Sequence, residues 1–351
     1  MVSPLRLRQE EAALLPNAIE ITHSDIVKFL TCRQLFQYGS TLGRNLMPKK
    51  RAVYFAFGTL LHQALEQYYL GHESPEDFYV QEARKILAQV EEAGIDHLED
   101  LLDELVLGPF LIRAYRDWDR MHNDFEVVST EKRITYRLTD KTPGVFVSMR
   151  YDMLVHRESD HKPNRYWIVD FKTAKRMPND SELEVWGYLD QSLLYQAVAE
   201  RVFAEQGIEI AGISFIHIWK RMPTAPEMTT TGLTRRSSLV TTAERYLEAI
   251  VEHGLDPKDY EDVLDSIRKS YNGKWFMRND FVASHEQREL YLERLKNIVS
   301  DMLDPELKIY PSPRVQNCTY CDFKEPCMTR QVGANDEPIL ASLFVESPER
   351  D

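Results

Sequence analysis

The sequence contains 351 residues, with 43 lysines and arginines against 56 aspartates and glutamates, so its net charge is −13 with neutral histidine. It is 43% hydrophobic and 28% charged with 14 glycines and 17 prolines, which excludes collagen-like, low-complexity and wholly disordered proteins. The longest apolar stretch, near residues 52–61, is about half the ~20 residues that a membrane-spanning helix needs, and Glu10 and Glu11 stand where a signal peptide needs an apolar core. We therefore expect a cytoplasmic protein without a membrane segment.

The N-terminal third of the chain is predicted to be helical. Apolar side chains recur at helical spacing over residues 24–36, with Ser24 as the N-cap and Cys32 inside the helix. A second helix over residues 58–69 carries His62. Charged helical segments follow this helix as far as the strands.

The periodicity then changes to that of β-strands. Three β-rich segments follow one another, at residues 126–138, 145–156 and 166–173. In the second segment the alternating apolar side chains from Val145 to Val155 share one face, and Asp152 lies on the other. In the third, Asp170 and Lys172 share a face. The first two segments are joined by a turn and predict an antiparallel hairpin.

A crossover unit follows the third strand. A long helix over residues 183–206 leads into a fourth strand over residues 208–219. Strand, helix and strand in this order make a right-handed crossover, so the third and fourth strands should be parallel. Together with the antiparallel hairpin they predict an α/β protein with a mixed sheet.

Asp152, Asp170 and Lys172 are the first candidates for chemistry. On one strand, Asp170 and Lys172 lie roughly 7 Å apart on the same side. If the neighbouring strand brings Asp152 beside them, the two carboxylates converge on a hard cation such as Mg²⁺ or Mn²⁺, and Lys172 orients or helps deprotonate a water that attacks a phosphodiester. An Asp-x-Lys triplet alone is more often an exposed ion pair. The apolar strand around it and the isolated acid on the next strand favour the metal site.

The order of these motifs resembles that of the PD-(D/E)XK nuclease superfamily, and more narrowly that of the RecB-like nucleases. The resemblance covers about residues 21–330. The matching segments are the histidine motif at 58–66, Arg150-Tyr-Asp152, Asp170-Phe-Lys172-Thr173 and Gln191-Ser-Leu-Leu-Tyr195. One departure is Met149, which stands where the family usually has glycine before Arg-x-Asp.

This resemblance implies a fold and a role for each matched residue. The fold is a restriction-endonuclease-like mixed sheet flanked by helices, with helical insertions. The implied metal ligands are His62, Asp152, Asp170 and the carbonyl of Phe171. The implied catalytic lysine is Lys172, and the residues that line the site and hold the scissile phosphate or the DNA strand are Gln191 and Tyr195. Glu131 is either a further, water-mediated contact or a solvated strand acid.

The four cysteines form a second candidate site. Cys318, Cys321 and Cys327 fall within ten residues, at a spacing typical of zinc or iron–sulfur ligands. Cys32 taken alone would be a buried thiol. The complete pattern, with Cys32 before the histidine motif, resembles the iron–sulfur branch of this nuclease family, which includes the AddB nuclease domain and the CRISPR-associated adaptation exonucleases. It implies a [4Fe–4S] cluster that staples the N- and C-terminal parts together, with Zn²⁺ as the alternative.

The domain organisation is predicted around one nuclease domain. The expected segments are an N-terminal tail at 1–20, the nuclease domain at 21–330 and a C-terminal tail at 331–351. Inside the domain we expect a helical segment at 71–122, a core at 126–220, an insertion at 221–300 and the cysteine cluster at 318–327. Basic clusters, as candidates for a local basic groove, lie at 49–51, 172–176, 220–221 and 235–236, although a solvated face is the commoner role of such clusters.

The expected function is that of a bacterial, archaeal or phage-encoded metal-dependent DNA nuclease. An exonuclease on single-stranded or frayed ends, active in DNA repair, recombination or processing, fits the motifs best. The alternative is a non-catalytic DNA-end-binding subunit of a helicase–nuclease or integration complex. The sequence has no Gly-x-x-x-x-Gly-Lys-Ser/Thr loop, so unwinding would require a helicase or a recombination or integration protein as partner.

Overall fold

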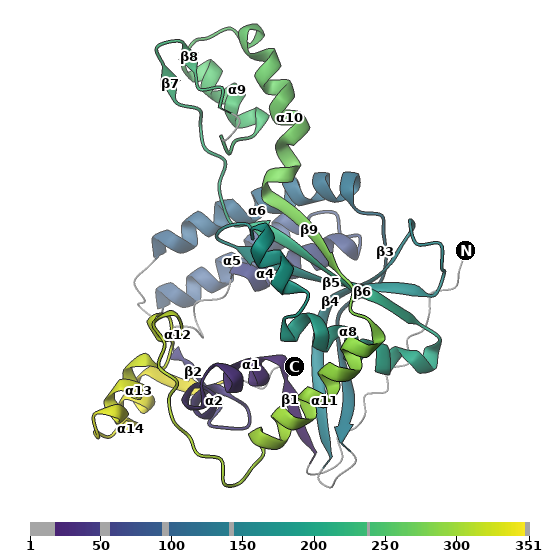
Figure 1. Cartoon of the computed structure of the whole chain (residues 1–351). Coiled ribbons are helices and arrows are strands. Elements are labelled where there is room, and N and C mark those ends of the chain that lie inside the picture. Colours follow the sequence, from purple (N-terminus) through teal and green to yellow (C-terminus); the bar gives the residue numbers. More distant parts are fainter. Residues whose placement is uncertain (1–17, 50–56, 93–97, 140–143, 237–238, 348–351) are drawn as a thin grey trace.

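The computed structural model describes residues 18–49, 57–92, 98–139, 144–236 and 239–347. Its centre is a mixed sheet with the strand order β1-β4-β5-β6-β9, in which β3 pairs with the remaining edge of β4 (Figure 1). The strands of this sheet are β1 (Ile19–Thr22), β3 (Phe125–Thr139), β4 (Val145–Arg157), β5 (Arg165–Ala174), β6 (Glu209–Trp219) and β9 (Phe276–Phe281). The predicted α/β class with a mixed sheet is confirmed.

Helices cover both faces of this sheet. One face carries α1 (His23–Thr31), α8 (Asp190–Phe203) and α11 (His285–Met302). The opposite face carries α4 (Phe57–Tyr69), α5 (Pro75–Glu92) and α6 (Leu98–His122). The short helices α7 (Asp180–Trp186) and η1 (Ala204–Gln206) flank α8. The crossover prediction is confirmed, because β5 and β6 are parallel and α8 joins them.

The sheet forks along one edge of β4. β3 runs antiparallel along the whole of the other edge. On the forked edge, β1 pairs in parallel with residues 145–148, whereas β5 pairs antiparallel with residues 153–156. Within the described residues, no strand pairs with this edge at residues 149–152. The fork leaves room for polar side chains in the middle of an otherwise apolar sheet.

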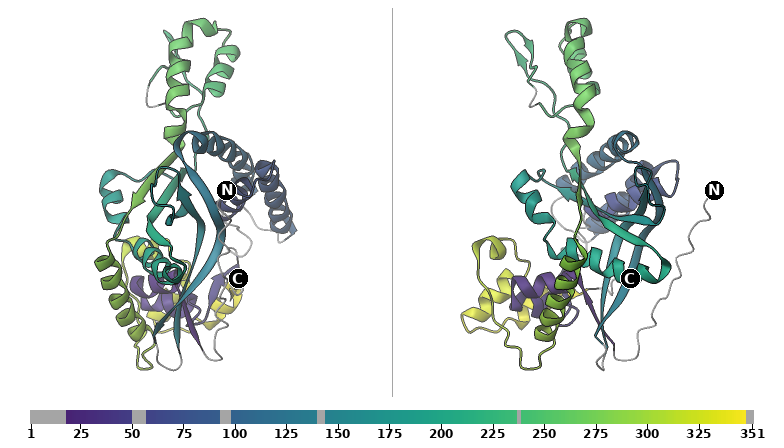
Figure 2. Two further views of the ribbon diagram at one scale, coloured as in Figure 1. Left: turned by 90° about the vertical axis from the view of Figure 1, so that its right-hand side faces the viewer. Right: turned by 45° about the vertical axis from the view of Figure 1, so that its right-hand side comes forward.

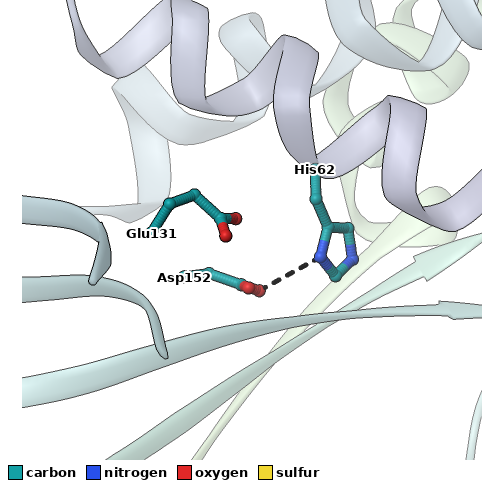
Figure 3. Close-up of side chains that lie close together, drawn as sticks. All are labelled: His62, Glu131 and Asp152. Atoms are coloured by element: carbon teal, nitrogen blue, oxygen red, sulfur yellow. Dashed lines mark ion pairs between the residues drawn. The ribbon is translucent and has the colours of Figure 1, made fainter. Parts of the chain in front are cut away.

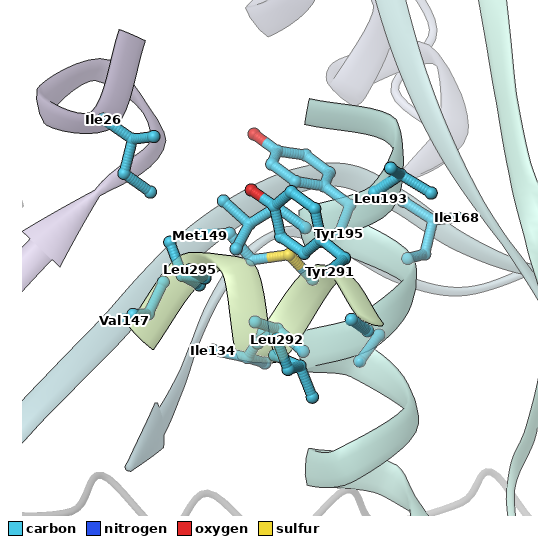
Figure 4. Close-up of a cluster of buried hydrophobic side chains, with 14 of the residues drawn as sticks. Ile26, Ile134, Val147, Met149, Ile168, Leu193, Tyr195, Tyr291, Leu292 and Leu295 are labelled. Carbon is cyan, nitrogen blue, oxygen red and sulfur yellow. The ribbon is translucent and has the colours of Figure 1, made fainter. Parts of the chain in front are cut away.

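The larger core lies between the sheet and α8 with α11. Figure 4 shows Val147 and Met149 of β4 facing Tyr195 of α8 and Leu292 of α11. Full burial of each such side chain stabilises the folded state by roughly 1.5–3 kcal/mol. Met149, the departure from the usual glycine, is therefore accommodated as a core residue. The prediction that the alternating apolar side chains from Val145 to Val155 share one face is wrong at the C-terminal end of β4, because Val155 packs in the opposite core. Both faces of this central strand are covered by helices.

The second core holds α4 in place over the sheet. Leu61 of α4 packs in it beside Phe171 of β5. On the outer side of α4, Tyr68 and Tyr69 donate hydrogen bonds to the buried carboxylate of Asp119 on α6, at 3.0 and 2.5 Å. These contacts fix the position and rotation of α4 against the strand fork, and hence the direction in which His62 points.

Residues 220–275 form an arm that projects from the end of β6 (Figure 2). Its elements are β7 (Met228–Thr229), β8 (Gly232–Leu233), α9 (Ala243–Glu252), η2 (Pro257–Tyr260) and α10 (Glu261–Trp275). The arm has a small core of its own around Tyr246 and Leu264. The insertion expected over residues 221–300 ends at residue 275 in the structure. β9, which follows it, pairs with β6 of the central sheet, and α11 packs on α8.

The N- and C-terminal parts of the described chain meet in a terminal lobe, defined here as residues 32–48 with residues 310–346. Its elements are α2 (Arg33–Gly39), β2 (Leu46–Pro48), α12 (Val315–Thr319), α13 (Lys324–Gln331), α14 (Glu337–Leu343) and β10 (Phe344–Glu346). β10 pairs antiparallel with β2. Tyr38 donates a hydrogen bond to Asp336 and packs with Phe323, Leu340 and Phe344. Residues 337–346, expected in a C-terminal tail, are therefore packed, because their apolar side chains complete this small core.

The first helix also differs from prediction. Thr22, and not Ser24, caps α1, in a capping box with Asp25. Cys32 does not lie inside a helix; its extended backbone separates α1 from α2. Among the described residues, no helix is long and apolar enough to span a bilayer.

Candidate active site

The fork of the sheet gathers the residues that the sequence singled out. His62 reaches down from α4, and its Nδ1 lies 3.4 Å from Oδ2 of Asp152 on β4 (Figure 3). The same Asp152 oxygen accepts a hydrogen bond from the Phe171 amide at 2.6 Å. This bond joins β4 to β5 just beyond their last paired residues, Met153 and Val169. Asp152 thus sits at the point where the two strands separate.

Asp170 and Lys172 lie beside this pair on β5. Lys172 Nζ is 2.5 Å from Asp170 Oδ2, and Gln191 Nε2 donates a hydrogen bond to Asp170 Oδ1 at 2.9 Å. Asp170 is 5% exposed, so its charge is shielded from solvent. Gln191 and Tyr195 lie one turn apart on α8, as predicted, and Tyr195 is buried. The structure therefore brings all the matched motifs to one place.

The electrostatics of the carboxylates differ. Burial favours the neutral form of Asp152, but His62 and the amide of Phe171 outweigh it and hold the pKa of Asp152 below its usual range. Burial, with the nearby Asp152 charge, raises the pKa of Asp170 against the opposing charge of Lys172. Burial opposes charging of His62, but Asp152 outweighs it and raises the His62 pKa. Asp152 thus holds its negative charge more readily than Asp170 does.

Two histidines near Lys172, the buried His217 and the half-buried His23, were missed by sequence reasoning. Burial and the Lys172 charge lower the pKa of His23 and that of His217 to about 4. His217 lies beside Lys172 in the β5–β6 register, and His23 stacks edge-on against Tyr195. Both rings are neutral at pH 7 and add no positive charge around the lysine. No periodicity in the sequence could have indicated them, because both approach Lys172 from other elements.

Glu131 is a third acid near the fork, beside Asp152 and Asp170. It lies on β3 with Arg150 Nε 2.7 Å from its Oε2. One ligand atom from each of His62, Glu131 and Asp152 lies within 4.8 Å of the others. Burial, followed by the Asp152 charge, raises the pKa of Glu131 to about 7 against the opposing charge of Arg150. Glu131 therefore interacts electrostatically with the other charged groups of the site.

A second group of possible ligands, outside the fork, is an ion-pair network. Glu200, His285 and Glu289 also bring ligand atoms within 4.8 Å. Arg288 lies 3.1 Å from Glu200, and Arg201 pairs with Glu289. Because an arginine neutralises each acid, this group joins α8 to α11 rather than attracting a cation.

The basic clusters are largely paired with acids. Lys50 and Arg51 lie outside the described residues. Members of the other clusters form ion pairs, namely Lys172–Asp170, Arg176–Glu182, Lys220–Glu104 and Arg235–Asp262. A DNA phosphate would have to compete with these acids, which favours the interpretation of the clusters as solvated faces.

The four cysteines line one cavity of about 1320 Å³ in the terminal lobe. Cys32 Sγ accepts a hydrogen bond from the Ser312 amide at 3.3 Å. Burial and the neighbouring thiols, Cys32 among them, raise the pKa of Cys321 and that of Cys327. In the part of the chain that the structure describes, no three of these sulfur atoms lie within 4.8 Å of one another. The cysteines thus share a cavity without forming a closed ligand set.

Comparison with known proteins identifies the family. The model of the PD-(D/E)XK nuclease superfamily matches residues 20–328, which include every motif at the fork. The chain belongs to the PD-(D/E)XK nuclease superfamily. This membership, together with the paired aspartates and the lysine, implies a metal-dependent nuclease.

Other comparisons add little to this family assignment. No curated protein matches the chain significantly. A solved structure titled "Crystal structure of SSO0001" is 10% identical, covers 87% of this chain and 84% of its own, and has a TM-score of 0.30. At that TM-score the likeness has no bearing on fold or function.

Proposed function

We propose that this nuclease is a Mg²⁺- or Mn²⁺-dependent deoxyribonuclease that acts as an exonuclease on single-stranded or frayed DNA ends. The observation that carries this proposal is the meeting of Asp152, Asp170 and Lys172 at the sheet fork, with His62 directly over Asp152. A binding protein has no need to keep two carboxylates and a lysine together. DNA repair, recombination or processing is the corresponding role.

The donor set at the fork fits a hard divalent cation. His62, Asp152, Asp170 and the Phe171 carbonyl would hold it, since carboxylate, carbonyl and imidazole donors suit Mg²⁺ and Mn²⁺. A cation bound there supplies Lewis acidity and a more acidic water. In the chain itself, the Asp152–Phe171 hydrogen bond fixes one carboxylate and Gln191 fixes the other. The ligands are therefore oriented before any cation binds.

Lys172, Gln191 and Tyr195 have different tasks in this proposal. The Lys172 side chain, whose Nζ lies 2.5 Å from Asp170 Oδ2, is placed to orient the attacking water as an ammonium group or, as the neutral amine, to accept a proton from that water. Gln191 keeps Asp170 in position, and its amide lines the approach of the DNA strand. Burial raises the pKa of Tyr195 far above neutrality, so its hydroxyl can donate a hydrogen bond to a phosphate but cannot act as a base.

The terminal lobe supports a [4Fe–4S] cluster held by Cys32, Cys318, Cys321 and Cys327. A zinc ion with Zn–S distances of about 2.3 Å needs its sulfur ligands about 3.8 Å apart, and no three of the described cysteine sulfur atoms lie within 4.8 Å of one another. Zn²⁺ remains the alternative occupant. This site would place the protein in the RecB-like iron–sulfur branch.

The cellular setting follows from the same proposal. A cytoplasmic nuclease without its own helicase motif would act on ends that a helicase or a recombination or integration protein provides. The second candidate function is a non-catalytic DNA-end-binding subunit of such a complex. The complete Asp152, Asp170 and Lys172 set favours catalysis, because a subunit that only binds DNA would not be selected to retain it.

The test is digestion of end-labelled linear single-stranded DNA, linear duplex and circular single-stranded DNA with Mg²⁺ or Mn²⁺. We expect short products from the linear single strand, slower trimming of the duplex and an intact circle. Reactions with EDTA and with Lys172→Ala are the controls. Cleavage of the circle would contradict an exonuclease, and DNA binding without cleavage in either metal would favour the binding subunit.

A further inference from the structure

An arginine at the base of the arm is held against an aromatic ring. The guanidinium carbon of Arg221 lies 4.9 Å from the centre of the Trp219 ring. The Arg221 amide donates a hydrogen bond to the Trp219 carbonyl, and the Arg221 carbonyl accepts one from Nε1 of the buried Trp275, both at 2.8 Å. Trp275 is the last residue of the arm, so both ends of the arm fix this position. Arg221 is therefore oriented although it is exposed.

This arginine lies at the edge of the sheet that carries the active site. In the parallel β5–β6 register Trp219 pairs with Ala174, two residues after Lys172. The backbone of Trp219 is thus roughly 7 Å further along the sheet than that of Lys172. The Trp219 indole also donates a hydrogen bond to the Lys175 carbonyl at 2.9 Å. Open α/β sheets bind ligands at the carboxyl ends of their parallel strands, and here those ends carry Arg221 and Lys175.

Arg221 and Lys175 are exceptions among the basic clusters, most of whose members are paired with acids. Arg176, on the same loop as Lys175, pairs with Glu182. Within the described residues, neither Arg221 nor Lys175 forms an ion pair, and the Arg221 guanidinium donates no hydrogen bond. The chain has a net charge of −13 and repels a polyanion overall. Local cations without an acidic partner are therefore what could draw DNA to this edge.

The contact between Arg221 and Trp219 suits the binding of a phosphate group. Stacking on an indole uses the face of a guanidinium and leaves its edge, with the N–H donors, available for a bidentate contact with phosphate oxygens. Because the backbone and the ring already restrict this side chain, it loses less conformational entropy on binding than a free arginine would.

We propose that Arg221, oriented by Trp219, binds a backbone phosphate of the DNA strand that is cut at the fork, with Lys175 as a second electrostatic contact. This inference rests on the proposed action on DNA. The RecB-like motifs described above all precede this segment, so they assign no role to it. The competing explanation is that Arg221 only covers Trp219 from solvent.

The experiment measures the affinity of the full chain for a fluorescein-labelled oligothymidylate by anisotropy in Ca²⁺ over a series of salt concentrations, with the intactness of the strand checked on a gel. Arg221→Gln should weaken binding about tenfold, the size of one charge-assisted contact. It should also lower the slope of log affinity against log salt by about 0.7, the value for one phosphate contact on a single strand.

Two further substitutions test whether the effect belongs to this contact. Trp219→Leu should weaken binding by releasing Arg221, and the double variant should bind no more weakly than Arg221→Gln alone, because both remove the same contact. Arg176→Gln is the matched control, since that arginine is exposed at the same edge but paired with Glu182. It should bind like the wild type. An equal loss in Arg176→Gln would mean that only overall charge matters, and would overturn the inference.

A variant that keeps the ring covered separates binding from folding. Arg221→Met retains an aliphatic chain over Trp219 without the charge, so it should unfold at the wild-type temperature and still lose affinity and salt dependence. Wild-type affinity and slope in both Arg221→Gln and Arg221→Met would overturn this inference alone. Failure of the wild type to bind DNA would overturn the proposed action on DNA, and the inference with it. Binding that depends on Arg221 without any cleavage in Mg²⁺ or Mn²⁺ would overturn the nuclease proposal and support the inference.

Discussion

The sheet fork and the cysteine cavity bring reactive side chains together in opposite ways. At the fork, side chains from α4, β4 and β5 already contact one another, as in the His62–Asp152 and Lys172–Asp170 pairs. In the cavity, Cys32 and Cys318 are 286 residues apart in sequence, and no three of the described cysteine sulfur atoms lie within 4.8 Å of one another. The fork is built into the sheet, whereas the cavity exists only because the two chain ends meet.

This difference predicts how each site responds to its metal. Cation binding at the fork replaces existing ion pairs and needs little movement. Burial raises the pKa of Cys321 and that of Cys327, so metal binding in the cavity must release protons from these thiols. We therefore expect the fork to determine activity and the cavity to determine the stability of the terminal lobe.

The largest expected effect is on cleavage at the fork. Asp152→Ala and Asp170→Ala should abolish cleavage and metal binding, because too few carboxylates remain to replace the hydration shell of the cation. Lys172→Ala should lose about 10²- to 10⁴-fold in rate but keep metal binding. End-labelled digestion and calorimetry measure the two properties. Cleavage by Lys172→Ala at the wild-type rate would show that the assigned active site is wrong.

The next effect concerns the cavity. Cys32→Ala and Cys321→Ala, purified without oxygen, should both lose the brown colour and the roughly four irons of a [4Fe–4S] cluster. A link across 286 residues restrains the unfolded chain by ~5–6 kcal/mol in the chain-entropy model, so both variants should unfold at a lower temperature. The β2–β10 pairing should keep the lobe folded. Stoichiometric zinc without iron in the wild type would support the zinc alternative instead.

A smaller effect tests how closely α4 must approach the fork. A Cβ on Gly58 would lie 2.9 Å from Oγ1 of Thr173. Gly58→Ala should therefore push the start of α4 away from β5, destabilise the fold by about 1–3 kcal/mol and weaken metal binding through His62. Thr173→Ala in the same chain should restore much of the loss. Denaturant unfolding and calorimetry report both quantities, and a double variant no better than Gly58→Ala would contradict the contact.

The smallest effect is on pH dependence. The folded-state pKa of His62 is raised above 6.5, so its pairing with Asp152 stabilises the metal-free protein below pH 6.5, and this stabilisation is lost as the pH rises through the folded pKa. Metal binding has the opposite dependence, because the imidazole must be neutral: affinity should fall about tenfold per pH unit below that pKa. His62→Gln should remove both trends. Unfolding scans and calorimetry at pH 5.5–8 distinguish them.

Much of the active site was predictable from sequence because its motifs are local. A period of two places Asp170 and Lys172 on one face of a strand whatever surrounds it, and a strand–helix–strand unit makes β5 and β6 parallel. The helical spacing that carries His62 is equally local. These patterns sufficed for the fold class and for the residues that meet at the fork, and the superfamily followed from the resemblance of their motifs.

The tertiary structure decided what depends on contacts distant in sequence. Glu131 lies near Asp152 only because the β3–β4 register sets it opposite that residue, and His217 approaches Lys172 only through the β5–β6 pairing. The packing of Phe344 required a partner strand from the other end of the chain. Periodicity records which side of an element is apolar, but not which element will cover it, so the neighbours of each site emerged only when the chain was folded.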